Sequence, residues 1–141
     1  MFRRWPTRSM SFWFALLVAI SLVGPLTSAR AAITPAGDVE PDPSTWNNST
    51  TGYIGNTASG TLTIDGGSDL VSGTASIGNS STGSGLVSVT GSGSTWASTY
   101  LYIGNSGSGT LSITNGGSVS VGNSYIGNYA GSTGVVMVDG T

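Results

Sequence analysis

The sequence predicts an all-β protein, built as a parallel β-solenoid (β-helix). Two observations carry the prediction. A four-residue word recurs at intervals of 23, 26 and 23 residues, and each copy is followed by a block that opens with Gly and then alternates in aliphatic residues. The richness in Gly, Ser and Thr is typical of flexible linkers, but a flexible chain has no reason to place apolar residues at fixed intervals.

Residues 1–31 are predicted to be a secretory signal peptide. Three Arg precede an apolar stretch within Ser11 to Leu26, and Ala29-Arg30-Ala31 has small residues at both positions that a signal peptidase reads. Gly24-Pro25 interrupts the stretch, which is shorter than the roughly 20 residues needed to span a bilayer, so a retained anchor is the less favoured alternative. We therefore expect export, with a mature segment that starts at Ala32 and does not insert into a membrane.

Residues 32–45 are expected to be a linker or an N-terminal cap of the solenoid. The segment contains three Pro and three acidic residues but few apolar ones. Such a composition does not predict core strands.

Residues 46–141 form the predicted repeat domain. The word starts at Tyr53, Ser76, Tyr102 and Tyr125, so the first and third copies are 49 residues apart, as are the second and fourth. The spacing predicts two 49-residue double turns, the last one truncated, with about four rungs of three short strands each. A 49-residue period also suits propeller blades, but two blades cannot close a ring and the half-period is already a complete unit.

Each rung is expected to place equivalent side chains in columns along the solenoid, about 4.8 Å apart. The predicted core columns are Ile54, Ile77, Ile103 and Ile126 in the first strand, Leu62, Val87, Leu111 and Val136 in the second, and Trp46, Leu70, Trp96 and Val119 in the third.

Two corners of each turn have recognisable residues. One corner carries an Asn column, in which stacked carboxamides are expected to hydrogen-bond from rung to rung. The opposite corner is predicted to turn at glycines with positive φ. The Asn column consists of Asn56, Asn79, Asn105 and Asn128, and the corner glycines are Gly66-Gly67, Gly91 with Gly93, and Gly116-Gly117.

The composition excludes several kinds of chemistry. The sequence has no Cys and no His, so it has no thiolate or imidazole for a metal site or a catalytic triad. Its four basic residues are all Arg within the first thirty positions, whereas six acidic residues follow, so nucleic acid is not an expected partner. We expect no catalytic, metal-binding or cofactor-binding residues and no cofactor.

Two residue groups are candidate binding sites. Asp65 and Asp69 could bind Ca²⁺ or act as acid and base, but the third turn carries Thr114 or Asn115 and Ser118 or Val119 near these positions. Asp139 faces Thr90 in the paired turn, so the acids are sporadic, which favours surface carboxylates. Tyr53, Tyr100, Tyr102 and Tyr125 could stack on sugars or simply pack along the strands. A carbohydrate-binding or carbohydrate-active β-helix is therefore the alternative function.

Three longer words, Ser108 to Val119, Gly91 to Trp96 and Leu101 to Gly104, resemble the bacterial repeat associated with autotransporter (type V secretion) passengers and PEP-CTERM proteins. The resemblance spans almost all of residues 46–141. It implies an exported, surface-associated bacterial protein of the adhesin kind, extracellular or at the outer membrane of a Gram-negative-type cell.

The expected function is a non-enzymatic structural or adhesive repeat segment of a cell-surface protein, such as the stalk of an autotransporter passenger. The sequence stops within a turn, which is expected of a fragment of a longer chain. The candidate partners are an extracellular glycan or other surface ligand, and a second copy of the chain at the open C-terminal rung.

Overall fold

The protein is described by a computed structural model that covers residues 31–140. The segment expected to be a signal peptide, residues 1–31, lies outside the described residues except for Ala31. Within the described range, no helix has the length and apolar character needed to cross a membrane.

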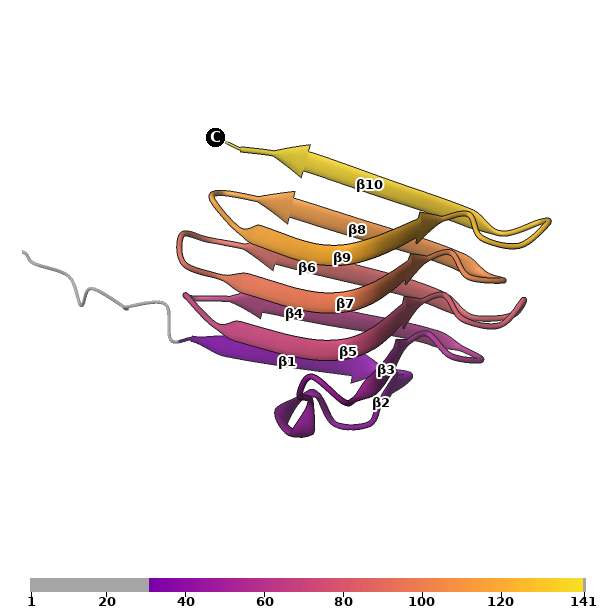
Figure 1. Cartoon of the computed structure of the whole chain (residues 1–141), viewed down its shortest axis with the longest axis horizontal. Helices are drawn as coiled ribbons and strands as arrows, with labels where there is room; N and C mark the ends of the chain where they lie inside the picture. The colour runs from indigo at the N-terminus through magenta and orange to yellow at the C-terminus, as the bar shows by residue number, and fades with distance from the viewer. Residues whose placement is uncertain (1–30, 141) are drawn as a thin grey trace, which may run out of the picture.

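Residues 31–140 fold into two facing five-stranded sheets, and the chain passes from one sheet to the other in each coil (Figure 1). The strands of the first sheet, in spatial order, are β1 (Ala32–Gly37), β4 (Ser59–Asp65), β6 (Ser84–Thr90), β8 (Ser108–Thr114) and β10 (Thr133–Asp139). Those of the second are β2 (Val39–Glu40), β3 (Thr51–Ile54), β5 (Asp69–Ile77), β7 (Thr95–Ile103) and β9 (Ser118–Ile126).

The pairing between coils is parallel and keeps one register. In the first sheet Gly60, Gly85, Gly109 and Gly134 are consecutive partners, so the opening Gly of every block stacks on the same residue of the next coil. The two sheets pack face to face, so each strand must place apolar side chains on the side that faces the other sheet. The predicted parallel β-solenoid of about four turns is confirmed.

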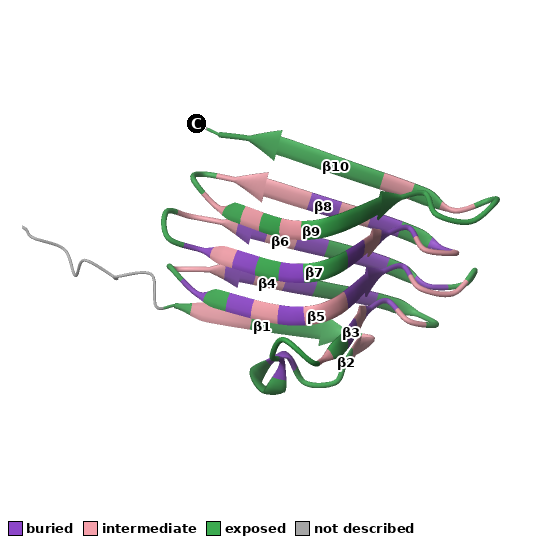
Figure 2. Ribbon diagram, in the orientation of Figure 1, coloured by how far each residue is buried: buried purple, intermediate pink, exposed green. Residues whose placement is uncertain are grey.

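The core lies between the two sheets (Figure 2). It contains the buried members of the predicted columns together with Ile64, Ala75, Val89 and Leu101. Ile54, Ile77, Ile103 and Ile126 are in register, as are Leu62, Val87, Leu111 and Val136, and Leu70, Trp96 and Val119. Burial decreases toward the last coil, where Ile126 is 56% and Val138 71% exposed. Each rung is therefore buried by the rungs on both sides of it.

The expectation of three strands per rung is wrong, because each coil contains two. Leu70 and Ile77 belong to one nine-residue strand, β5, and not to two strands separated by a corner. In the pairing of β5 with β7, Ser72 is the partner of Ser98 and Thr74 is the partner of Tyr100. Gly73 and Thr99, which lie between them, are not paired in this ladder. This irregularity shifts the alternation by one residue, so that Leu70 and Ile77 both point inward although seven residues separate them.

Trp46 is buried, but it does not occupy the layer predicted for it. It lies outside the strands, next to the short 3₁₀ helix η1 (Pro43–Thr45), and its indole N–H donates to the carbonyl oxygen of Pro41 at 2.9 Å. A Cβ on Gly52 would lie 2.2 Å from its ring. Gly52 is in register with Ala75, not with Leu70, so the indole fills the space that a side chain at Gly52 would need.

Residues 32–45, expected to be a linker or a cap, cover the first coil. β1 pairs with β4 and β2 pairs with β3, and both pairings are antiparallel, unlike every pairing between coils. Asp38, between β1 and β2, accepts hydrogen bonds at its Oδ2 from the backbone N–H groups of Thr57 (2.7 Å) and Ala58 (2.8 Å). These bonds fix the cap to the loop that connects β3 and β4.

The corners explain the double-turn period. The loops next to the Asn column are residues 55–58, 78–83, 104–107 and 127–132, so a shorter loop alternates with a longer one.

The opposite corner turns at glycines with positive φ, as predicted, at Gly66, Gly67, Gly91, Gly93 and Gly116. Gly117 does not have a positive φ, and the non-glycine Asn115 takes a left-handed conformation instead (φ 52°). Asn is one of the few residues with a side chain that accepts this conformation readily.

Candidate functional site

The Asn column forms a continuous chain of side-chain hydrogen bonds. The carboxamide of Asn79 donates to Asn56 at 2.8 Å, Asn105 donates to Asn79 at 2.9 Å, and Asn128 donates to Asn105 at 2.9 Å. At the capped end, Asn56 donates to the carboxylate of Glu40 at 2.7 Å. A carboxamide has both a donor and an acceptor, so each inner Asn bonds to both neighbours. The column links successive coils, and its polar groups are used within the protein.

A glycine with positive φ precedes each Asn of the column and positions it. Gly55, Gly78 and Gly104 have φ of 74°, 72° and 71°. A Cβ at these positions would lie 2.1 to 2.2 Å from the carbonyl oxygen of Ser84, Ser108 or Thr133. The recurring Gly-Asn pair along the coils therefore has a steric origin: no other residue fits the turn without displacing the neighbouring backbone.

A second polar contact lies inside the core. The indole N–H of Trp96 donates to the hydroxyl of Ser72 at 3.1 Å, and that hydroxyl donates to Ser98 at 3.0 Å. The hydroxyl of Ser98 in turn donates to the carbonyl oxygen of Tyr100 at 2.9 Å. Neither serine was predicted from the sequence. The signal available in the sequence was Trp96 itself, because the N–H of a buried tryptophan needs a hydrogen-bond acceptor nearby.

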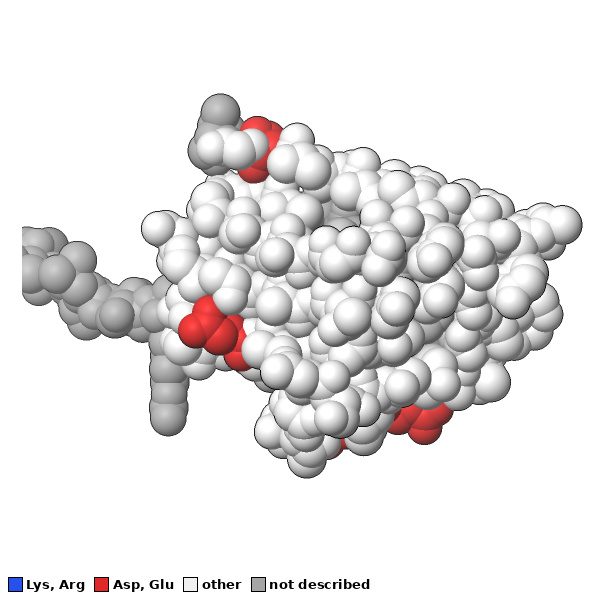
Figure 3. Space-filling view, in the orientation of Figure 1, with Lys and Arg blue, Asp and Glu red and all other residues white. Residues whose placement is uncertain are grey.

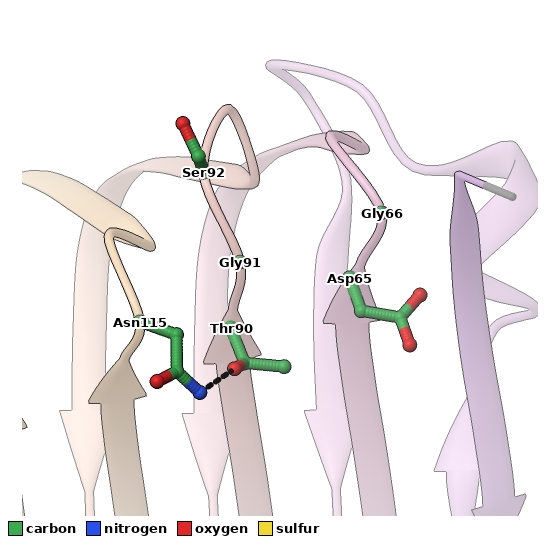
Figure 4. Close-up of a pocket in the computed structure, with 6 residues that line it drawn as sticks. All are labelled: Asp65, Gly66, Thr90, Gly91, Ser92 and Asn115. Atoms are coloured by element: carbon green, nitrogen blue, oxygen red, sulfur yellow. Dashed lines mark hydrogen bonds between the residues drawn. The ribbon is translucent and has the colours of Figure 1, made fainter. Parts of the chain in front are cut away.

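Asp65 ends β4 and Asp69 begins β5, so they flank one corner, and no hydrogen bond joins their carboxylates. Asp69 accepts a hydrogen bond from the hydroxyl of Thr95. Asp65 lines a hollow of about 460 Å³, but its carboxylate points away from Thr90 and Asn115, which are hydrogen-bonded to each other at 3.1 Å (Figure 4). The Oδ1 of Asp65 is buried and has no hydrogen-bond partner among the described residues. Asp65 is therefore less solvated than the sequence suggested.

Charges are sparse and dispersed. Over residues 31–140 all the charged side chains are acidic, and the face drawn in Figure 3 shows a few small red patches on a surface that is otherwise neutral. Within this range no three His, Cys, Asp or Glu residues lie together in an arrangement suited to a metal ion.

The four candidate tyrosines fall into two columns of the second sheet. Tyr53, Ser76, Tyr102 and Tyr125 are in register, and the rings of Tyr102 and Tyr125 stack with centroids 4.9 Å apart and planes 9° apart. Because this distance is close to the spacing of paired strands, the rings face each other along the solenoid. Tyr102 and Tyr125 therefore pack against each other along the strands, which is the alternative to stacking on a sugar.

Tyr100 stands in a different column, with Thr74 before it and Asn123 after it. No ring stacks on Tyr100 within the described residues, and it is 42% exposed. Its nearest column neighbours are much smaller, so the side of the ring toward the first coil borders open space.

That space is part of a shallow depression, here called the Asn48 groove. Its first hollow, of about 220 Å³, is lined by Asn48, Ser49, Thr51, Gly73, Thr74, Thr99 and Tyr100. The second hollow, of about 420 Å³, shares Asn48 and Thr99 and is also lined by Val71, Ser72, Ala97, Ser98, Ser120, Val121 and Gly122. The groove follows the irregularity of β5 and β7 across several coils, which the repeat pattern did not predict.

Comparison of the chain with protein-family models, with curated proteins and with solved structures finds no match.

Proposed function

We propose that this protein is a non-enzymatic, exported structural repeat segment, which forms a stiff stalk at a bacterial cell surface. The observation that carries the proposal is the uniform register between coils, in which every strand of one coil pairs with its equivalent in the next. The Asn chain adds a side-chain link at one corner of each coil. Such an array lengthens by adding coils and resists bending, because every coil is bonded to its neighbours along both sheets.

The chemistry of the sequence supports a role without catalysis. The common general bases and nucleophiles His, Cys and Lys do not occur in the 141 residues, and no three acids of residues 31–140 lie together. The resemblance of the repeat words to those of autotransporter-associated and PEP-CTERM-associated proteins supports a place at the cell surface, as does the signal-like N-terminal sequence.

Export is tested by expressing the complete sequence in a Gram-negative host and sequencing the N-terminus of the product. We expect a processed protein that starts at Ala32 and is recovered outside the cytoplasm. Ala31→Arg should block processing, because a signal peptidase requires a small residue at that position, whereas Thr34→Arg should not. Recovery of the unprocessed chain from the cytoplasm alone would contradict the proposal.

A further inference from the structure

The Asn48 groove has the features of a binding site for an uncharged, hydroxyl-rich ligand. One exposed aromatic ring, Tyr100, borders a hollow whose other walls are hydroxyl and carboxamide side chains. Among the described residues no charged side chain lines either hollow of the groove. Sugars combine an apolar C–H face with hydroxyl edges, so they match a single ring surrounded by neutral donors and acceptors.

The polar side chains of the groove have unused hydrogen-bonding capacity. The carboxamide of Asn48 and the hydroxyls of Thr51, Thr74 and Thr99 make no hydrogen bond to any described residue. In contrast, the carboxamides of the Asn column and the hydroxyls of Ser72 and Ser98 are used within the protein. The groove thus offers donors and acceptors without breaking a bond that stabilises the fold.

The loop that carries Asn48 is held in place. The backbone N–H of Asn47 donates to the hydroxyl of Thr50 at 2.9 Å, and the N–H of Ser49 donates to the Asn47 side chain at 2.9 Å. The carbonyl oxygen of Thr50 accepts hydrogen bonds from the N–H groups of Gly73 and Thr74, both at 3.0 Å. A site whose wall is already ordered loses less conformational entropy when a ligand binds.

We propose that the Asn48 groove binds a neutral glycan. One sugar unit packs against the ring of Tyr100 in the smaller hollow, and the chain continues past Thr99 into the larger one. The purely acidic charge of residues 31–140 disfavours uronic or other anionic sugars. This inference goes beyond the proposed stalk function, since a stalk needs no ligand.

The test is calorimetric titration of the protein, purified after expression of the complete sequence, with hexasaccharides of glucose, mannose, xylose and N-acetylglucosamine, and with hexagalacturonate as the charged comparator. We expect saturable binding of at least one neutral hexasaccharide and none of hexagalacturonate. Tyr100→Ala should weaken binding about tenfold, and Asn48→Ala about fivefold.

Tyr125→Ala is the matched control, because Tyr125 is also 42% exposed but lies outside the groove. Its binding should stay within about twofold of the unaltered protein, and thermal melting should show that every variant is folded. The inference is overturned if no neutral hexasaccharide binds, if Tyr100→Ala binds normally, or if Tyr125→Ala loses as much affinity as Tyr100→Ala. Failure of export would contradict the stalk proposal and leave this result unaffected.

Discussion

Trp96 donates its indole N–H to the hydroxyl of Ser72 in the preceding coil, at 3.1 Å, and both side chains are almost fully buried (0% and 2% exposed). The contact joins two neighbouring coils within the core, and Ser72 also lines the larger hollow of the Asn48 groove. It therefore stabilises the stacking of coils as well as satisfying the tryptophan.

Ser72→Ala should lower the free energy of unfolding by about 1–3 kcal/mol, because it leaves the indole N–H buried without an acceptor. Trp96→Phe alone removes the donor but leaves a smaller ring in the core. Urea denaturation of both single variants and the double variant gives the coupling between the residues. If Ser72→Ala lowers the free energy of unfolding as much in the Trp96→Phe variant as in the unaltered protein, the assigned role of the hydrogen bond is wrong.

Asn105→Ala should be more destabilising than Asn128→Ala. Asn105 lies inside the Asn chain and loses two side-chain hydrogen bonds, whereas Asn128 loses one. At about 1 kcal/mol for each bond, we expect losses of about 2 and about 1 kcal/mol in the free energy of unfolding. Chemical denaturation measures both. Equal effects would mean that each carboxamide acts locally and that the chain of hydrogen bonds adds nothing.

Gly78→Ala tests the steric origin of the turn before each Asn. Gly78 has φ 72°, and a Cβ there would lie 2.1 Å from the carbonyl oxygen of Ser108. Gly131 has a similar φ of 82°, but a Cβ there would meet nothing within 4 Å. Gly131→Ala should therefore lower the free energy of unfolding only by the strain of the left-handed conformation, about 1–2 kcal/mol. Gly78→Ala should lower it clearly more, because the added Cβ also meets the neighbouring backbone. The midpoints of urea denaturation give the comparison, and similar costs would show that backbone conformation alone selects glycine.

Asp38 should make the stability of the cap dependent on pH. The backbone N–H of Thr57, followed by that of Ala58, donates to this carboxylate and lowers the pKa of Asp38 below its usual value. Because the folded state binds the proton less tightly than the unfolded chain, the stabilisation is complete above about pH 4, the usual pKa of Asp. It is lost as the pH falls through the lowered value.

Asp38→Asn should therefore flatten the fall in melting temperature as the pH drops below about 4, relative to the unaltered protein. Asp69→Asn provides the control, since Asp69 accepts a hydrogen bond from a side-chain hydroxyl and none from the backbone of the cap. An unchanged pH profile for Asp38→Asn would show that the two N–H bonds do not contribute to the stability of the folded state.

The repeat spacing was sufficient to predict the solenoid and the register of its core columns apart from Trp46, because equivalent side chains in stacked coils must recur at fixed sequence positions. It was not sufficient to count the strands. Leu70 and Ile77 are seven residues apart, an odd number, so a regular strand would place them on opposite faces. A corner between two strands and an irregularity within one strand both resolve this conflict, and the sequence does not distinguish them.

The groove and the antiparallel pairing of the cap could not be predicted for a different reason. Asn48 and Thr99 are brought together by the pairing of whole coils, and neither belongs to a recurring word. The one available signal for the groove was Tyr100, the single aromatic residue in a column with Thr51, Thr74 and Asn123. The antiparallel pairing of residues 32–40 leaves no periodic pattern, because that segment forms each of its pairings once.

The alternating loop lengths beside the Asn column imply that the surface of the solenoid has a coarser repeat than its backbone. Residues 78–83 and 127–132 form the longer loops, and a shorter loop lies between them. An oriented array of many such coils would diffract at the strand spacing of about 4.8 Å and also at about 9.6 Å, twice that value. A partner that binds along this edge would then meet equivalent contacts only on every second coil.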